Sequence, residues 1–229
     1  MTEVDELEGP PESARAGRST VVYVAAAVVV LLVGAAIGML ITLSAVGGDE
    51  TPGTDSIDVG FAQDMRVHHL QAITMAGLAR DRSDDPEVRQ LAFDIESTQL
   101  DQSGQFSGWL TIWGQPTLPP ADQPHMRWMA GATHSHGAGE SGVELMPGMA
   151  TSAELAKLRG LKGTEFNVYF LQLMLRHHHG GLEMAGYAAG HARLDYVRNL
   201  ASKIQQGQTA ESTLLTNMLT DRKSQPLPN

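Results

Sequence analysis

Histidine and methionine recur at the same spacing in two segments of the chain. The first segment reads DMRVHHLQAITMA from Asp64, and the second reads LMLRHHHGGLEMA from Leu173. Each places adjacent histidines between two methionines, one about a turn before them and one about two turns after them. Thioether sulfur is a soft ligand that selects Cu(I), and imidazole suits copper in either oxidation state. The spacing therefore predicts copper ligands at Met65, His68, His69, Met75, Met174, His177, His178 and Met184.

Other metals fit these residues less well. Calcium and magnesium prefer oxygen ligands, which are sparse here, and structural zinc normally uses cysteine, which the chain lacks. A ferritin-type di-iron site needs Glu-x-x-His on two helices, whereas Glu183 follows its histidines and Thr74 stands at the matching position. The alternative is that these residues only pack a core. The duplicated spacing, and the cost of burying imidazoles without partners, favour the metal.

Two further groups of residues accompany these ligands. Histidines and methionines between the two segments, in what we expect to be an exposed flexible loop, are predicted accessory ligands: His125, Met126, Met129, His134, His136, Met146 and Met149. Polar residues that could orient the imidazoles form the second group: Asp64, Gln99, Gln102, Glu183, Gln208 and Glu211. For the glutamines and Glu211, a place on the bundle surface is the alternative.

The two segments belong to an internal repeat with an offset of 109 residues. Residues 61–99 align without gaps on 170–208, with 15 identities in 39 positions. In each copy apolar residues recur at alternating steps of four and three, which is typical of one face of an α-helix. A second helix follows, capped in the first copy by Asp84 or Asp85 with Pro86 in its first turn. Two such hairpins predict a four-helix bundle in which the histidine-bearing stripes face each other.

The bundle is expected to contain a long crossover between the two hairpins. The expected boundaries are, in chain order, repeat one 57–114, crossover 115–163, repeat two 164–221 and a tail 222–229. Proline and glycine are frequent in the first part of the crossover. Thr151 with Glu154 is a capping-box pair, which predicts one short helix through about Arg159.

An uncharged run of 26 residues, 21–46, precedes the repeats. As a helix it is about 39 Å long, enough to cross a hydrocarbon core of about 30 Å, and it exceeds the apolar region of a cleaved signal peptide. Arg15 and Arg18 before it place the N-terminus in the cytoplasm. The sequence thus predicts a single-pass signal anchor at 21–46, after a disordered cytoplasmic tail, 1–20. A linker, 47–56, leads to a domain outside the cytoplasm, in the periplasm or at the cell surface.

Composition excludes several classes of function. The chain has 16 basic and 26 acidic residues, a net charge of −10, which argues against nucleic-acid binding through clustered lysine and arginine. The absence of cysteine excludes disulfides and thiolate sites. The sequence has no Gly-x-Ser-x-Gly motif, phosphate-cradling loop or clear acid/base carboxylate pair. An enzyme is therefore the less favoured interpretation.

The two segments also resemble a known family. DMRVHHLQAITMA and MLRHHHGGLEMA, with MPGMAT about 30 residues upstream of the second, are similar to the domain of unknown function 305 family over roughly 57–221. The resemblance implies a ferritin-like four-helix bundle, usually secreted or membrane-anchored in bacteria, with some members implicated in copper binding. It implies metal association for the eight ligands named above and for the element Met146 to Met149. Thr74 and Gln102 depart from the pattern that Glu183 and Glu211 follow.

Together these observations predict an all-α protein, with one N-terminal transmembrane helix followed by a ferritin-like four-helix bundle. The favoured function is extracytoplasmic binding of copper, as Cu(I) or Cu(II), for sequestration or transfer. The expected partners are the lipid bilayer, the metal ion and other copper-handling proteins. Two alternatives remain open: a metal-dependent oxidoreductase with its redox centre in the bundle core, and a structural or interaction bundle without metal.

Overall fold

The computed structural model describes residues 13–46, 51–130 and 142–227. Within those ranges the regular elements are six α-helices and one short 3₁₀ helix, η1, and the only β-pairing is a single bridge between His125 and Val143. The predicted all-α class is confirmed. The chain separates into two compact units, Met1–Thr51 and Pro52–Asn229.

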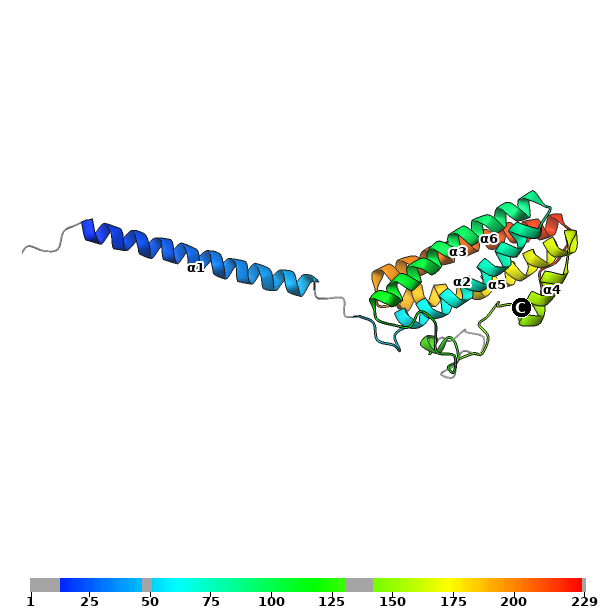
Figure 1. Cartoon of the computed structure of the whole chain (residues 1–229), viewed down its shortest axis with the longest axis horizontal. Helices are drawn as coiled ribbons and strands as arrows, with labels where there is room; N and C mark the ends of the chain where they lie inside the picture. Colours follow the sequence, from blue (N-terminus) through cyan, green and yellow to red (C-terminus); the bar gives the residue numbers. More distant parts are fainter. Residues whose placement is uncertain (1–12, 47–50, 131–141, 228–229) are drawn as a thin grey trace, which may run out of the picture. The chain divides into compact units, whose positions relative to one another are not determined.

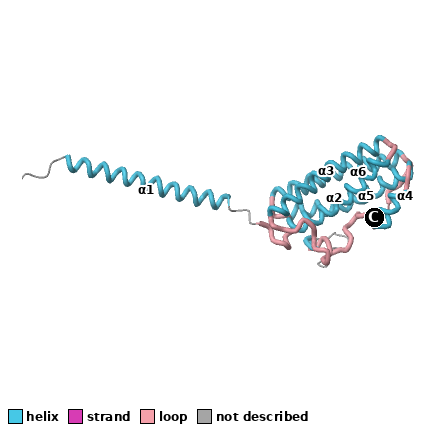
Figure 2. Tube along the Cα trace, viewed as in Figure 1, coloured by secondary structure: helices cyan, strands magenta, loops and turns pink. Residues whose placement is uncertain are grey.

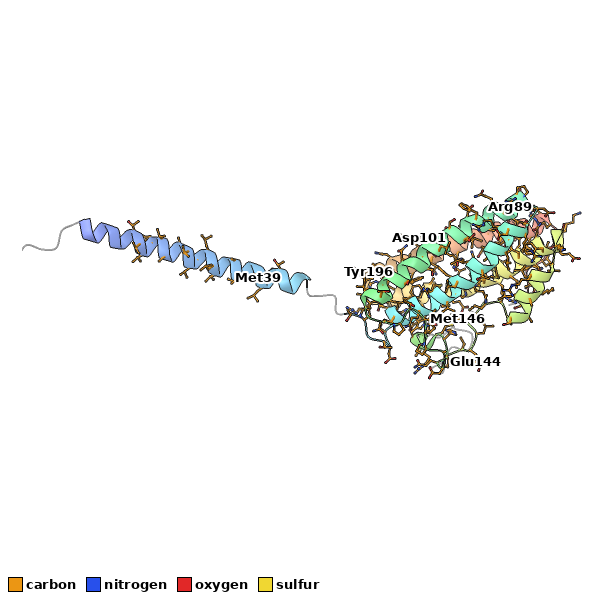
Figure 3. The ribbon with its side chains drawn as sticks, viewed as in Figure 1. Met39, Arg89, Asp101, Glu144, Met146 and Tyr196 are labelled. Atoms are coloured by element: carbon orange, nitrogen blue, oxygen red, sulfur yellow. The ribbon has the colours of Figure 1, made fainter. Side chains whose placement is uncertain are left out.

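The first unit contains one long apolar helix, α1, Ser13–Val46. Its stretch Thr20–Thr42 is the one helix in the described part of the chain that is long and apolar enough to cross a membrane. The side chains of this stretch are exposed (Figure 3). Helices of this kind serve as membrane spans or as signal sequences.

Two helical hairpins form the second unit, and their four long helices lie together in Figure 1. The first hairpin consists of α2, Ile57–Arg82, and α3, Pro86–Ile112. The second consists of α5, Gly163–His191, and α6, Asp195–Asp221. Each hairpin packs along its own length, and α2 packs against α5 to join the two. A shift of 109 residues places α3 on α6, so the sequence repeat is also a structural repeat.

The helix ends follow the predicted capping. Asp85 is the residue that caps α3, and its carboxylate accepts two backbone N–H groups of the first turn. After α3, Gly114 has a φ of 67°, which glycine adopts without the steric cost that other residues pay. Thr151 and Glu154 form the predicted capping box of α4, Ser152–Gly160.

The turn of each hairpin is held by a buried polar residue of the other hairpin. Asp58 on α2 accepts hydrogen bonds from the backbone N–H groups of Arg193 and Leu194, at 3.1 and 2.9 Å, in the α5–α6 turn. Asn167 on α5, the repeat equivalent of Asp58, accepts a 2.7 Å hydrogen bond from the Ser83 hydroxyl in the α2–α3 turn. Because buried polar groups are satisfied across the interface, these contacts favour one register of the hairpins.

The crossover is not a plain loop, although Figure 2 shows long loop segments in it. It contains η1, Arg127–Met129, which contacts α2, and it contains α4, which contacts α5. Arg176 on α5 forms a two-bond ion pair with Glu154 on α4, with both N–O distances at 2.8 Å. The predicted ligands His134 and His136 lie outside the described residues.

The bundle core contains two apolar clusters. One cluster, here called the Met65 cluster, also includes Met184, Phe61 and Phe106. The other, here called the Met75 cluster, also includes Met174, Phe166 and Phe170. On both α2 and α5 the adjacent histidines lie between the two methionines, so imidazoles separate the two clusters along the bundle.

Candidate metal site

Four imidazoles form a layer inside the bundle, with no exposed area on any of them. We call His68, His69, His177 and His178 the histidine layer. The rings of His68 and His177 lie close together, with centroids 3.7 Å apart and planes tilted by 34°. His177 Nε2 lies 3.0 Å from the carbonyl oxygen of His68, and His68 Nε2 lies 3.2 Å from that of Pro147. The structure thus brings the two histidine motifs together, from α2 and α5.

The other two histidines are each held by the helix that follows in the same hairpin. His69 Nε2 lies 2.7 Å from Gln102 Oε1 on α3. His178 Nε2 lies 2.6 Å from Glu211 Oε2 on α6. Since Gln102 and Glu211 are separated by the repeat offset of 109 residues, the two contacts are the same contact with a different acceptor.

One nitrogen of each ring in the histidine layer has no hydrogen-bond partner among the described residues, and in all four rings it is Nδ1. Each Nε2 faces an oxygen that accepts a hydrogen bond, so in the neutral form of each ring Nε2 carries the proton and Nδ1 carries the lone pair. Buried polar atoms are normally satisfied, and a neutral imidazole nitrogen is a common metal ligand. The described residues nevertheless contain no group of three His, Cys, Asp or Glu side chains placed to hold a metal ion.

Burial keeps three imidazoles of the histidine layer, those of His68, His69 and His177, uncharged at neutral pH. Desolvation lowers the pKa of His68 to about 4 and that of His69 to about 3. It lowers the pKa of His177 well below the ordinary 6.5, and neighbouring imidazoles act in the same direction because like charges would repel. The neutral form is the one that binds metal ions, so these rings need lose no proton to become donors.

The four predicted methionine ligands are completely buried on both sides of the histidine layer. Met65 and Met184 lie in one apolar cluster, and Met75 and Met174 lie in the other. Each pair combines a residue of α2 with one of α5, as expected if the two histidine-bearing stripes face each other. Thioether sulfur therefore lies along the helices above and below the imidazoles.

The predicted accessory methionines are not in an exposed loop. Met126, Met129 and Met146 are at most 2% exposed and belong to the Met65 cluster, against which Met149 also packs. The expectation of an exposed, flexible segment is wrong for these residues. A thioether is apolar and flexible enough to fill irregular gaps in a core, and here the crossover folds its methionines onto the bundle.

Asp64 holds this part of the crossover in place. Its buried carboxylate accepts hydrogen bonds from His125 Nδ1 at 2.7 Å, from the Met126 backbone N–H at 2.7 Å and from Trp128 Nε1 at 2.8 Å. The hydrogen bond that His125 donates to Asp64 raises the pKa of His125. These three hydrogen bonds of Asp64 reach the crossover, whereas the sequence suggested that Asp64 orients a histidine of its own motif.

The other predicted polar residues fall into different places. Glu211 contacts an imidazole, as described above, but Gln99 and Gln208 are buried with amide atoms that have no partner among the described residues. Glu183 lines a groove of about 340 Å³ between α5 and the crossover. Gln102, the repeat equivalent of Glu211, contacts His69, in keeping with the orienting role that the sequence suggested for this pair.

A short segment of the crossover closes the seam between α2 and α5. We call residues 146–150 the strap; Met146 is labelled in Figure 3. The Gln71 side chain on α2 donates to the carbonyl oxygen of Ala150 at 2.9 Å and accepts from its N–H at 2.7 Å. On α5 a Cβ atom at Gly180 would lie only 1.9 Å from the carbonyl oxygen of Pro147. The strap therefore depends on a close approach that only glycine allows.

Replacement of Gly180 by alanine is expected to displace the strap. The added methyl group meets backbone atoms that cannot rotate away, so we expect a loss of about 1–3 kcal/mol in the free energy of unfolding. Faster hydrogen exchange should appear at the amides of the strap. Gly104→Ala on α3, where nothing lies within 4 Å, is the matched control and should be neutral or stabilising. Guanidinium unfolding that shows Gly180→Ala to be as stable as this control would contradict the prediction.

Comparison with known proteins agrees with this fold. A DUF305 protein from Streptomyces coelicolor, described as a predicted secreted protein, is 40% identical, with a TM-score of 0.68 over 77% of this chain and 100% of that one. A DUF305 fragment from Deinococcus radiodurans is 32% identical, with a TM-score of 0.58 over 72% and 96%. CopM in the Cu(II)-bound form is 24% identical, with a TM-score of 0.54 over 72% and 96%.

A search of curated proteins gives no match. The profile of the domain of unknown function (DUF305) matches residues 58–219. This range covers all four helices of the bundle, the crossover and the histidine layer. The chain therefore belongs to the DUF305 family.

Proposed function

We propose that this protein binds copper outside the cytoplasm, and that it sequesters the ion or passes it on. The observation that carries the proposal is the histidine layer, with four buried imidazoles whose Nδ1 atoms have no hydrogen-bond partner among the described residues. Burial of such groups is costly unless something satisfies them. A metal ion would accept the free lone pairs and offset that cost.

The donor set favours copper over harder metal ions. The chain offers imidazole nitrogen from the histidine layer and thioether sulfur from both flanking clusters, and this combination suits Cu(I) and also accommodates Cu(II). Because no three His, Cys, Asp or Glu side chains among the described residues are placed so that they alone could hold a metal ion, we propose that methionine completes the coordination. The proposed ligands are Met65, His68, His69, Met75, Met174, His177, His178 and Met184.

The relatives support copper as the cargo. CopM, which shares the fold at 21–24% identity, has structures in the Cu(II)-bound, Cu(I)-bound and Ag-bound forms. Silver and Cu(I) are soft monovalent ions, for which thioether sulfur is a suitable ligand. For the present chain these structures are a reason to test copper first.

We further propose that α1 anchors the bundle at the outer face of a membrane. Support comes from its apolar stretch Thr20–Thr42 and from the Streptomyces coelicolor relative, which is described as a predicted secreted protein. In this arrangement residues 1–20 are cytoplasmic, 21–46 cross the bilayer and 47–56 connect to the bundle. The partners are then the lipid bilayer, the copper ion and other copper-handling proteins.

The ligand assignment predicts that imidazole removal abolishes the tight copper site. The full chain in detergent should compete with a chromophoric chelator for Cu(I), whereas a variant with alanine at all four positions of the histidine layer should not. His191→Ala, at an exposed residue of α5, is the control and should bind as the wild type does. Circular dichroism reports whether each variant is folded.

A second variant keeps this test decisive if the fourfold alanine protein does not fold. Met65→Leu with Met184→Leu conserves volume, and such exchanges usually cost less than about 1.5 kcal/mol of stability, but it removes two thioethers. We expect weaker Cu(I) binding from this variant. Wild-type Cu(I) affinity and stoichiometry in a folded variant of either kind would overturn the proposed site.

A further inference from the structure

The two halves of the histidine layer differ in one charged group. His69 and His178 are repeat equivalents, both fully buried, and each offers Nε2 to an oxygen of the following helix. In the first hairpin that oxygen belongs to the neutral amide of Gln102. In the second hairpin it belongs to the carboxylate of Glu211, whose side chain is 24% exposed and therefore partly hydrated.

The acceptor on Nε2 controls how strongly the opposite nitrogen donates. A carboxylate that accepts the Nε2 proton fixes the tautomer and raises the basicity of the imidazole as a metal ligand. A neutral amide fixes the same tautomer without adding negative charge. Both rings keep an Nδ1 atom without a partner among the described residues, so the comparison concerns the same donor atom in two electrostatic settings.

From this difference we propose that Glu211 is a positioning residue that makes the His178 half of the layer prefer Cu(II), whereas the Gln102 amide leaves the His69 half better suited to Cu(I). The Coulomb attraction between a carboxylate and a divalent ion is twice that for a monovalent ion at the same distance. The negative charge therefore favours the oxidised form. This inference rests on the proposed function, because it assumes that the histidine layer binds copper.

The reciprocal variants Glu211→Gln and Gln102→Glu test the proposal. Each exchanges one acceptor for the other at the same repeat position and changes the size of the side chain very little. Loss of such a partner usually weakens metal binding by about 10–100-fold, so we expect that weakening of Cu(II) binding in Glu211→Gln. With half the charge on the ion, the logarithm of the change should halve, to about 3–10-fold for Cu(I).

The expected change in the ratio of the two affinities is also about 3–10-fold. At 59 mV for each tenfold change in a one-electron couple, the reduction potential of bound copper should rise by about 30–60 mV in Glu211→Gln. In Gln102→Glu it should fall. A role limited to stability would change both affinities equally and leave the potential unchanged.

A measurement on the metal-free protein separates this inference from the proposed function. In ¹H–¹⁵N NMR spectra of the full chain in detergent, the Nε2 proton of His178 should resonate further downfield than that of His69, because it bonds to a charged acceptor. Glu211→Gln should remove the difference. If the protein binds no copper but this difference is present, the proposed function fails and the contact stands.

Two outcomes would overturn the inference itself. One is copper binding in which Glu211→Gln and Gln102→Glu leave the ratio of Cu(II) to Cu(I) affinity at the wild-type value. The other is an Nε2 proton of His178 that is unaffected by Glu211→Gln. If one variant does not fold, as judged by circular dichroism, the reciprocal variant gives the same test with the opposite sign.

Discussion

The metal-free protein is expected to lose stability steeply as the pH falls from 6.5 towards 4. In this range an unfolded histidine binds a proton, whereas His68, His69 and His177 remain neutral because burial lowers their pKa. The unfolded state then binds more protons, so the free energy of unfolding decreases with decreasing pH. Each such histidine lowers the free energy of unfolding by about 1.4 kcal/mol for each pH unit. Three together lower it by about 4 kcal/mol for each pH unit.

A loss of this size is large compared with the 5–15 kcal/mol that stabilises a typical domain. Other titratable groups change the free energy of unfolding in a different pH range or by a smaller amount. Glu154, whose pKa is lowered to about 2 by its hydrogen bond with Arg176, destabilises the fold only as the pH falls from 4.5 towards 2. His125, whose pKa is raised, has the opposite sign: its contribution is complete below 6.5 and is lost as the pH rises through its folded pKa.

Urea unfolding at a series of pH values measures the number of protons taken up. Replacement of both His68 and His177 by glutamine, which keeps a donor on each side chain, should reduce the slope by nearly two protons. Exposed His191→Ala should leave it unchanged. A wild-type slope below one proton between pH 6 and 5 would show that His68, His69 and His177 are not neutral in the folded state.

Asp64→Ala is expected to cost about 3–5 kcal/mol of unfolding free energy. The substitution removes a buried charged acceptor and leaves the N–H groups of Met126 and Trp128, which it bonds in the interior, without their partner. Buried donors that lose a charged acceptor are among the costliest defects in a fold. The apolar side chains of the crossover would then lose their attachment to α2.

Chemical denaturation followed by circular dichroism checks this value. Asp94→Ala on α3 is the control, because Asp94 is exposed and accepts a hydrogen bond only from Gln90 on the same helix; its effect should stay within about 0.5 kcal/mol. Equal stability of the two variants would mean that the contacts of Asp64 with the crossover contribute nothing to folding.

Much of the bundle could be predicted because its signals are local and periodic. Apolar residues at alternating steps of four and three predict α2 and α5. Capping residues close in sequence, Asp85 and Thr151, predict where α3 and α4 begin. The repeat added what one helix cannot show, namely that two histidine-bearing stripes belong to one core. The close contact between the rings of His68 and His177 agrees with that expectation.

The crossover could not be predicted in the same way, since its order comes from contacts distant in sequence. Met126 and Met146 have no periodic neighbours that would mark them as core residues, yet both are buried. The available signal was a departure from the repeat. Asp64 stands where copy two has Leu173, and Gln71 stands where copy two has Gly180; three of these four residues contact the crossover.

The crosswise attachment of the hairpin turns has a consequence for folding. Asp58 on the first hairpin bonds the turn of the second, and Asn167 on the second bonds the turn of the first, so each turn depends in part on a residue of the other half. If the chain is cut between the two copies, we expect two fragments that fold when combined but not when each is alone. For the same reason, we expect that an ancestral protein with only one copy of the hairpin formed a homodimer.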